Sequence, residues 1–420
     1  MSAHGSSESG WFDARLNLDR FSRKYLRKAF PVHSTFFLGE IALFSFIILV
    51  ITGLYLAFLY EPSTQLVEFN GEQVPAAYVS VMRINDTPFG LIVRRVHHWS
   101  AHIMIVAAIL HLMRIFFTGT YKRPRELNWV VGFLLLMVTV VASFVGYLLP
   151  FDEFSVTATT IGYGITRSVP WIGPAFADFV FAGKFPAPGT IPRFFAYHVI
   201  LMPLIIIGLL TVHMLILLKQ KHSEPPYARA KTQGTKLIGV PAWPQQTALM
   251  AALFLFLVGG VLLISGFLPV HPVELYGPPR PGTPVVKPDW YFLWVFGVLK
   301  LIPGWMEFRF LGTTIGPEAI GGVLFPGLVI LLLLLIPFID RADTPKYYMD
   351  DPLRIPLRTA IGIGMSVLLL VLSLAGYKEE VGLSSTVLRI IAVVAPVAVG
   401  LISYGLLRGL KRTGRKHQGG

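Results

Sequence analysis

Eight apolar stretches, each about 20 residues long, recur along the chain and are separated by polar segments. About 20 apolar residues in a helix cross the roughly 30 Å hydrocarbon core of a bilayer. The pattern therefore predicts an all-α, polytopic membrane protein with about eight transmembrane helices. The predicted helices cover residues 36–60, 93–117, 129–150, 195–218, 247–269, 319–339, 356–376 and 386–407.

The polar segments divide the chain into five predicted parts. Aromatic residues and six Lys or Arg share residues 11–30, which favours an amphipathic helix at the membrane surface, with a solvated charged helix as the alternative. We expect the long segments 151–194 and 270–318 to form partly helical covers over a pocket at the outer face. The five parts are an N-terminal segment with the interfacial helix (1–35), a four-helix bundle (36–218), a connecting loop (219–246), a C-terminal four-helix unit with the second long loop (247–407) and a basic tail (408–420).

The net charge is +13, and the basic residues are distributed unevenly between the two sides of the predicted membrane helices. Lys and Arg total 23 in the segments on the side of the N-terminus and 9 in the segments on the opposite side. By the positive-inside rule the richer side is cytoplasmic, which predicts that both termini lie in the cytoplasm. This distribution explains the basic charge without nucleic-acid binding.

Four histidines occupy two of the predicted helices in two pairs. His97 and His111 are 14 residues apart, and His198 and His213 are 15 apart. At about 1.5 Å of rise per residue, each pair spans roughly 21 Å and stays broadly on one side of its helix. If the two helices lie side by side, the imidazoles form two stacked pairs at different depths. Burying ionisable residues in a membrane is costly, so four in matched positions indicate function.

Each stacked pair suits one haem iron held from both faces. Zinc is the alternative metal, but it prefers a compact tetrahedral cluster, which ligands roughly 21 Å apart on a helix cannot form. For any single histidine, hydrogen-bonded packing is the alternative. His98 points about 100° away from its neighbour His97 and is left out of the set. The chain has no cysteine, which excludes disulfides, thiolate ligands for an iron–sulfur cluster and a thioether-linked haem.

Glycines repeat the histidine interval on the two other helices of the first four. Gly39 and Gly53 are 14 residues apart, and so are Gly132 and Gly146. Glycine lets a flat macrocycle approach the backbone closely, although small residues also serve ordinary helix packing in membranes. We expect all four glycines to contact haem.

Three arginines near the histidines are candidates for binding haem propionates. Arg forms strong bidentate pairs with carboxylates, but each of the three could instead be a snorkelling residue at the end of a span. They are Arg94, three before His97; Arg114, three after His111; and Arg193, five before His198.

Six short segments carry a more specific resemblance. They are Trp11-Phe12-Asp13-Ala14-Arg15-Leu16, Arg94-Arg95-Val96-His97-His98-Trp99-Ser100-Ala101, Ile109-Leu110-His111-Leu112-Met113-Arg114, Gly146-Tyr147-Leu148-Leu149-Pro150, Pro192-Arg193-Phe194-Phe195-Ala196-Tyr197-His198 and Pro288-Asp289-Trp290-Tyr291. Together they resemble cytochrome b of the quinol–cytochrome c reductase, or cytochrome bc, family. The chain is similar to a bacterial form, with the chloroplast-type halves fused and the chloroplast-like spacing of the second histidine pair.

The resemblance implies two b-type haems and two quinone sites. His97 and His198 would bind the low-potential haem near the outer face, and His111 and His213 the high-potential haem near the cytoplasmic face. Quinol would be oxidised at the outer site, and the second electron would cross the membrane through the haems to an inner quinone, which contributes to a proton gradient. The implied catalytic residues of the outer site are Tyr147, Pro288, Asp289, Trp290 and Tyr291.

The same resemblance implies partners and a location. One electron would pass to a Rieske iron–sulfur protein and on to a c-type cytochrome, within a homodimeric respiratory complex. The complex would lie among the lipids of a bacterial inner membrane.

Asp289 stands where most members of the family carry Glu. A carboxylate at a membrane interface can accept a quinol proton if partial burial raises its pKa. The Asp form resembles that of bacteria that use menaquinol. The alternative is that Asp289 only caps the helix that begins near Tyr291, and Pro288 suits a helix start in either case.

Other departures concern the third haem and the inner site. Chloroplast-type members attach a third haem through a cysteine, which this chain lacks. At the inner site, Lys219, His222 and Glu224 are candidates that can equally be solvated loop residues. Phe296 stands where many members have Tyr, so a hydrogen bond to the Rieske partner is expected to be missing.

Two other classes of protein compete with this interpretation. A di-haem membrane anchor of a hydrogenase or dehydrogenase also pairs histidines on helices, but it does not explain eight spans or the two quinol-pocket motifs. A transporter with structural histidines would show inverted repeats, and the two halves of this chain show no such symmetry.

Overall fold

The computed structural model describes residues 15, 29–30, 34–226, 239–271, 273–280 and 287–416. Most of the predicted interfacial helix within residues 11–30 lies outside the described residues. Within the described part, eight helices are long and apolar enough to cross a membrane, which confirms the predicted all-α membrane fold. These candidate spans are Phe37–Leu59, Pro88–Phe117, Glu126–Leu148, Thr190–Gln220, Ala242–Phe267, Pro317–Ile339, Pro356–Gly376 and Ser385–Lys411.

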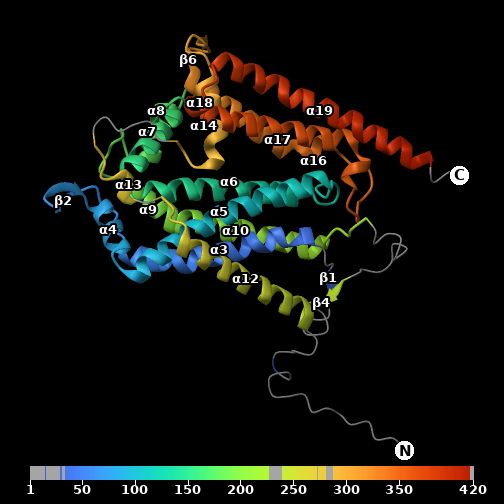
Figure 1. The fold of residues 1–420 in the computed structure, drawn as a ribbon, viewed down its shortest axis with the longest axis horizontal. Helices are drawn as coiled ribbons and strands as arrows, with labels where there is room; N and C mark the ends of the chain where they lie inside the picture. The colour runs from blue at the N-terminus through green and yellow to red at the C-terminus, as the bar shows by residue number, and fades with distance from the viewer. Residues whose placement is uncertain are drawn as a thin grey trace, which may run out of the picture.

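The first four spans form two helix pairs that run side by side (Figure 1). Helix α3 (Phe37–Leu59) packs on α5 (Pro88–Phe117). Helix α6 (Glu126–Leu148) packs on α10 (Met202–Gln220). Two short helical segments lead into α10 and complete its span: α9 (Thr190–Ala196) and the π-helical η3 (Tyr197–Leu201).

Helix α5 begins five residues earlier than the apolar pattern predicts, at Pro88 rather than 93. Thr87 is its N-cap, and the side chain accepts a hydrogen bond from Gly90 N at 3.1 Å. Proline suits the first helical position because its fixed φ and missing N–H cost nothing there. The capping residues, rather than the start of the apolar run, therefore set the N-terminal end of this helix.

Short helices from the two long loops cover the outer end of the bundle, as predicted, and a hairpin and a helix between α3 and α5 join them there (Figure 1, left). Asp152 starts one of them by accepting the backbone N–H of Ser155 at 2.8 Å. These covering elements are the hairpin of β2 (Leu66–Phe69) and β3 (Glu72–Pro75), with α4 (Ala76–Asn85), α7 (Glu153–Arg167), α8 (Gly173–Phe181) and α13 (Val273–Tyr276).

The later helices divide between the two sides of the molecule. Helix α12 (Thr247–Phe267) packs on α5 and α3, although chain order assigns it to the second unit. Helix α17 (Pro356–Gly376) packs on α19 (Ser385–Lys416) and on the short α14 (Leu293–Leu301). Helix α19 continues past the predicted start of the basic tail at residue 408.

The remaining described elements are short and connect or extend the long helices. They are β1 (Ala29–Phe30) paired with β4 (Val240–Pro241), η2 (Ser34–Phe36), η4 (Ala242–Gln246), η5 (Trp290–Phe292), the hairpin of β5 (Phe308–Phe310) and β6 (Thr313–Ile315), α15 (Pro317–Ala319), η6 (Ile320–Leu324), α16 (Phe325–Ile339), η7 (Pro352–Arg354) and α18 (Lys378–Val381).

Candidate functional site

Each of the four predicted glycines lies against the ring of one of the four predicted histidines. A Cβ atom placed on any of these glycines would meet the imidazole Cε1 atom at 2.5–3.3 Å, closer than ordinary van der Waals contact. The two glycines of α3 face the histidines of α5, and the two of α6 face those on the α10 span. The pairs are Gly39 with His111 (3.3 Å), Gly53 with His97 (3.1 Å), Gly132 with His213 (3.1 Å) and Gly146 with His198 (2.5 Å).

The outer pair of rings is arranged for a metal ion between them. The ring centres of His97 and His198 are 6.0 Å apart, and the ring planes make an angle of 73°. The Nδ1–H of His198 donates to the carbonyl oxygen of Ala142 at 2.9 Å. When one ring nitrogen donates in this way, the lone pair of the other is free to bind a metal.

His97 has a matching hydrogen bond to a hydroxyl group. Its Nδ1 lies 2.9 Å from Thr52 Oγ1, whose own proton is donated to the carbonyl oxygen of Ile48 at 2.7 Å. The hydroxyl therefore accepts from the ring, and the Nε2 lone pair of His97 is also free. Both outer histidines thus have the tautomer that an iron ligand needs.

The inner pair lies nearer the opposite end of the same helices. His111 interacts electrostatically with His213 and with Arg114. The Nδ1 atom of His111 is buried and has no hydrogen-bond partner among the described residues, whereas the His213 ring lies at the backbone of Asn128. A metal between the two rings would bind at Nε2, the nitrogen that is not needed for a protein partner.

The three predicted propionate partners lie in different surroundings. Arg94 lines the cavity at the outer pair and donates to Asn85 Oδ1 at 2.6 Å. Arg114 lies over the ring of Phe36 at 4.5 Å, and its Nε is buried without a partner among the described residues. Arg193 instead donates to the backbone carbonyl of Phe179 in α8, and it is not among the residues that line the cavity.

A cavity of about 260 Å³ joins the outer histidine pair to the predicted quinol pocket. Its wall includes both rings and the glycines that face them. Tyr147 and Asp289 also line it, which places the two quinol-pocket motifs at one chamber although they are 142 residues apart in the chain. The sequence motifs and the histidine pairs therefore converge in space.

A chain of hydrogen bonds holds one side of Asp289. The Tyr291 hydroxyl donates to Asp289 Oδ2 at 2.9 Å and lies 2.7 Å from Ser143 Oγ. Burial, together with the charge of Asp289, raises the pKa of Tyr291 well above its ordinary value, so the phenol stays protonated and donates. The Asp289 side chain makes no capping hydrogen bond to η5, which disfavours the interpretation of this residue as only a helix cap.

The other two predicted residues of this motif have distinct positions. Pro288 precedes η5 and is half-buried. The indole N–H of Trp290 donates to Nδ1 of His102 at 3.1 Å. Trp290 therefore contacts a histidine that the sequence analysis did not single out.

Three histidines in the outer chamber were missed or set aside. His98 and His102 both line the cavity, and their ring centres are 4.7 Å apart. Their spacing of four residues puts them on one helix face, which is the signal that could have identified them. His271 also lines the cavity and bonds to the buried Asp152 at 2.7 Å, a pairing between distant loops that no local pattern indicates.

Nitrogen and oxygen donors gather closely in this group. One ring nitrogen of His98, one of His102 and a carboxylate oxygen of Asp289 all lie within 4.8 Å of one another. Such a group can share a proton, hold a polar ligand or bind a cation.

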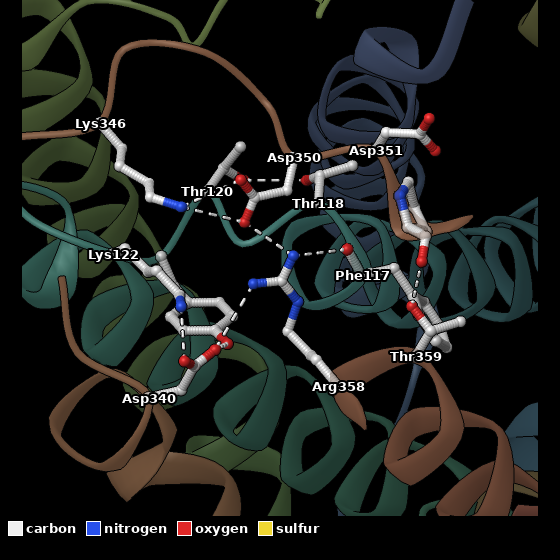
Figure 2. Close-up of polar contacts among 12 residues, drawn as sticks. Phe117, Thr118, Thr120, Lys122, Asp340, Lys346, Asp350, Asp351, Arg358 and Thr359 are labelled. Atoms are coloured by element: carbon white, nitrogen blue, oxygen red, sulfur yellow. Dashed lines mark hydrogen bonds and ion pairs between the residues drawn. The ribbon is translucent and has the colours of Figure 1, made fainter. Parts of the chain in front are cut away.

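The inner end contains a network of ion pairs around Arg358 (Figure 2). The guanidinium is 6% exposed, donates to Asp350 Oδ2 at 2.8 Å and reaches Asp340 Oδ2 at 3.5 Å. Asp340 also accepts from Lys122 and Tyr121, on the loop between α5 and α6. The network, which also includes Lys346, therefore ties the first half of the chain to the second.

The acidic members of this network have lowered pKa values. Burial alone would raise the pKa of Asp340, but hydrogen bonds from Lys122 and Tyr121 and the charges of Lys122 and Arg358 lower it overall. Burial opposes the shift at Asp350 as well, and the hydrogen bonds from Arg358 and Lys346 lower its pKa. Both carboxylates are therefore stabilised in the ionised form.

The inner-site candidates lie beside this region. The ring of His222 is 6.2 Å from that of Phe36, on which Arg114 also packs. Glu224 bonds through its backbone to Tyr347 and Met349, and burial raises the pKa of its carboxyl group. Lys219 lies in the last turn of α10. The assignment of an inner quinone site to these residues stays a prediction.

Comparison with known proteins agrees with this geometry. The family model for cytochrome b(N-terminal)/b6/petB matches residues 102–278, and that for cytochrome b(C-terminal)/b6/petD matches residues 280–395. A cytochrome bc1 complex cytochrome b subunit from Streptomyces coelicolor is 33% identical, over 97% of this chain and 78% of the relative. The cytochrome bc1 complex cytochrome b subunit from Mycobacterium leprae is 35% identical, over 96% of this chain and 77% of the relative. A solved structure of a hyperthermophilic respiratory Complex III superposes with a TM-score of 0.69 at 25% identity, covering 94% of this chain and 99% of that one.

Proposed function

Because this chain belongs to the cytochrome b family, we propose that it oxidises quinol at the outer chamber and passes one electron of each pair across the membrane through two b-type haems. It does so as the catalytic cytochrome b subunit of a respiratory quinol–cytochrome c reductase complex. Family membership disfavours the two competing classes, the di-haem anchor and the transporter.

The di-haem assignment rests mainly on one observation: each of four glycines lies against the ring of one of the four histidines. A Cβ at any of these glycines would crowd the imidazole, so the absence of a side chain lets each ring lie directly against the neighbouring helix. His97 and His198 would hold the low-potential haem, and His111 and His213 the high-potential haem. The bound haems would supply one-electron carriers at two depths in the membrane.

At the outer site, Asp289 is the proton acceptor for quinol. Tyr291 orients its carboxylate by donating to one oxygen, and Ser143 holds the Tyr291 hydroxyl, which leaves the other carboxylate oxygen for the substrate. Tyr147 is buried in the wall of the same chamber, and Pro288 and Trp290 complete the motif. Arg94 and Arg114 would neutralise haem propionates. Arg193 is a weaker candidate for this role, because its guanidinium donates to the backbone carbonyl of Phe179 in α8.

The partners and orientation follow from family membership and charge. A Rieske iron–sulfur protein must supply the cluster, because this chain contains no cysteine. The expected electron acceptor beyond it is a c-type cytochrome, in a homodimeric complex that uses menaquinol. The excess of Lys and Arg beside the inner ends of the helices supports an orientation with both termini in the cytoplasm, in a bacterial inner membrane.

The first test is the haem content of the purified complex, with a potentiometric titration of its reduced-minus-oxidised spectrum. We expect two b-type haems per chain that titrate at two separate potentials. His198→Leu should remove the outer component and His213→Leu the inner one. One haem per chain, or loss of the same component in both variants, would contradict the assignment.

The second test concerns the proton acceptor. Asp289→Asn keeps the shape of the side chain but removes its basicity, so quinol oxidation should fall by about 10²–10⁴-fold, the usual contribution of a general base. The measurement is the steady-state rate with a soluble quinol from pH 5 to 9. Unchanged turnover with an unchanged pH profile would show that Asp289 does not accept the proton.

A further inference from the structure

The contact between Trp290 and His102 fixes the protonation of the His102 ring. An indole N–H can only donate, so Nδ1 of His102 must accept it and carry no proton. The neutral ring then carries its proton on Nε2. Because His102 lines the outer chamber, its Nε2–H is the donor that it can still offer there.

Asp289 and His102 lie close together in the chamber without a direct contact. One ring nitrogen of His102 and one carboxylate oxygen of Asp289 lie within 4.8 Å of each other, and these two described residues form no direct hydrogen bond or ion pair. Two hydrogen bonds of about 2.8 Å to a shared oxygen span roughly 4.6 Å at a tetrahedral angle. A hydroxyl group between the two side chains can therefore donate to the carboxylate and accept from the imidazole.

A metal ion is the alternative occupant, and the Trp290 contact disfavours it. A neutral imidazole has one lone pair, and that of His102 already accepts the indole proton. Coordination would require His102 to lose this hydrogen bond. A ligand oxygen requires no such change.

We propose that His102 is a quinol-binding residue of the outer site, which holds the reacting hydroxyl together with Asp289, and that Trp290 fixes the tautomer in which it does so. The proposal rests on the proposed function, because it assigns a second polar partner to the same substrate. It makes Trp290 a positioning residue that acts through His102.

The step that His102 assists is the first proton transfer. The O–H bond of the quinol breaks, the proton forms a new O–H bond with Asp289, and the electron pair stays on the quinol oxygen. In this arrangement the Nε2–H of His102 would donate to the oxygen on which the negative charge develops. A fixed donor at such a position stabilises the charged form more than the neutral quinol, and it needs no change in its own protonation.

The experiment compares four variants in the intact purified complex, with a soluble quinol as substrate. His102→Leu removes the donor, His102→Gln restores an N–H near the position of Nε2, and Trp290→Phe keeps an aromatic ring without the indole N–H. Val106→Ala, on the exposed side of the same helix, is the control. The b-haem content and both haem potentials are measured alongside kcat and KM.

We expect His102→Leu to lower kcat by about 10²-fold, in the range for loss of one oxyanion donor. His102→Gln should recover most of this loss, Trp290→Phe should lie between, and haem content and potentials should stay at wild-type values throughout. Wild-type kinetics in His102→Leu would overturn the proposal, as would equal losses in His102→Leu and His102→Gln. If the wild-type complex holds no haem or does not oxidise quinol, the proposed function itself fails.

Discussion

The two ends of the helical bundle are built from different chemistry. At the outer end, histidines, aromatic rings and one accessible carboxylate surround a cavity of about 260 Å³. At the inner end, charged side chains from both halves of the chain meet in a network around the buried Arg358 (Figure 2). Neutral hydrogen-bonding groups dominate the outer end, and ion pairs dominate the inner end.

This difference indicates that the outer end serves the reaction, whereas the inner end holds the two halves of the chain together. A pocket that binds and releases substrate needs polar groups with spare hydrogen-bonding capacity, such as His102 and the second oxygen of Asp289. Charged groups that are buried and mutually satisfied resist rearrangement, because removing one leaves its partner uncompensated. We therefore expect changes at the histidine pairs and the outer chamber to affect the haems or turnover, and changes in the network around Arg358 to affect stability.

The largest expected effect is the loss of one haem on substitution of Gly146. Gly146→Ala places a Cβ atom 2.5 Å from the His198 ring, and Gly132→Ala places one 3.1 Å from the His213 ring. The first should abolish the low-potential component of the redox titration, and the second should weaken the high-potential one less. Gly208→Ala on α10, where a Cβ would meet nothing within 4 Å, is the control. Full retention of both haems in Gly146→Ala would contradict the close contact.

At the inner end, Arg358→Leu should destabilise the protein without changing the haems. It removes the cation that Asp350 and Asp340 share, and the two carboxylates keep Lys346 and Lys122 as partners, so the cost should lie below the about 3–5 kcal/mol for leaving a buried charge unpaired. The measurement is denaturant-induced unfolding in detergent, followed by the haem spectrum. Arg354→Leu is the matched control, because its pair with Asp351 is exposed and such pairs contribute about 0–1 kcal/mol. Equal effects of the two substitutions would mean that the network does not hold the halves together.

The smallest expected effect is an acid-sensitive part of the stability. The pKa values of Asp340 and Asp350 are below their ordinary value of 3.8, so their contribution is fully present above that pH. It is lost as the pH falls through the lowered pKa values of the folded state. Asp350→Asn should therefore flatten the decrease in unfolding midpoint below about pH 4. If the wild-type and variant curves are parallel, Asp350 is not a source of the acid sensitivity.

The sequence predicted most of what depends on periodicity. The eight spans follow from apolar length, and the match of glycine with histidine follows from two equal intervals on neighbouring helices. The covers over the outer pocket were also expected from long loops with apolar stretches. These features could be predicted because each depends on a pattern that can be seen within a single helix or loop.

The rest depends on contacts between distant segments. The early start of α5 is the exception, because it depends on the local cap at Thr87 outside the apolar run, whereas the partner of Arg193 depends on where α8 lies. His102 was overlooked because its partner Trp290 is 188 residues away in the chain. The network around Arg358 joins loops that are more than 200 residues apart, and no local pattern marks its members.

The packing of α12 on α3 and α5 has a consequence for how this protein can be encoded. A break in the polypeptide between residues 227 and 238 would leave all described contacts of α12 with the first half in place. Association of the halves is a property of their surfaces, so two genes could specify the same assembly as one. What a single continuous chain adds is stoichiometry, because each ribosome that finishes the protein delivers both halves in equal number.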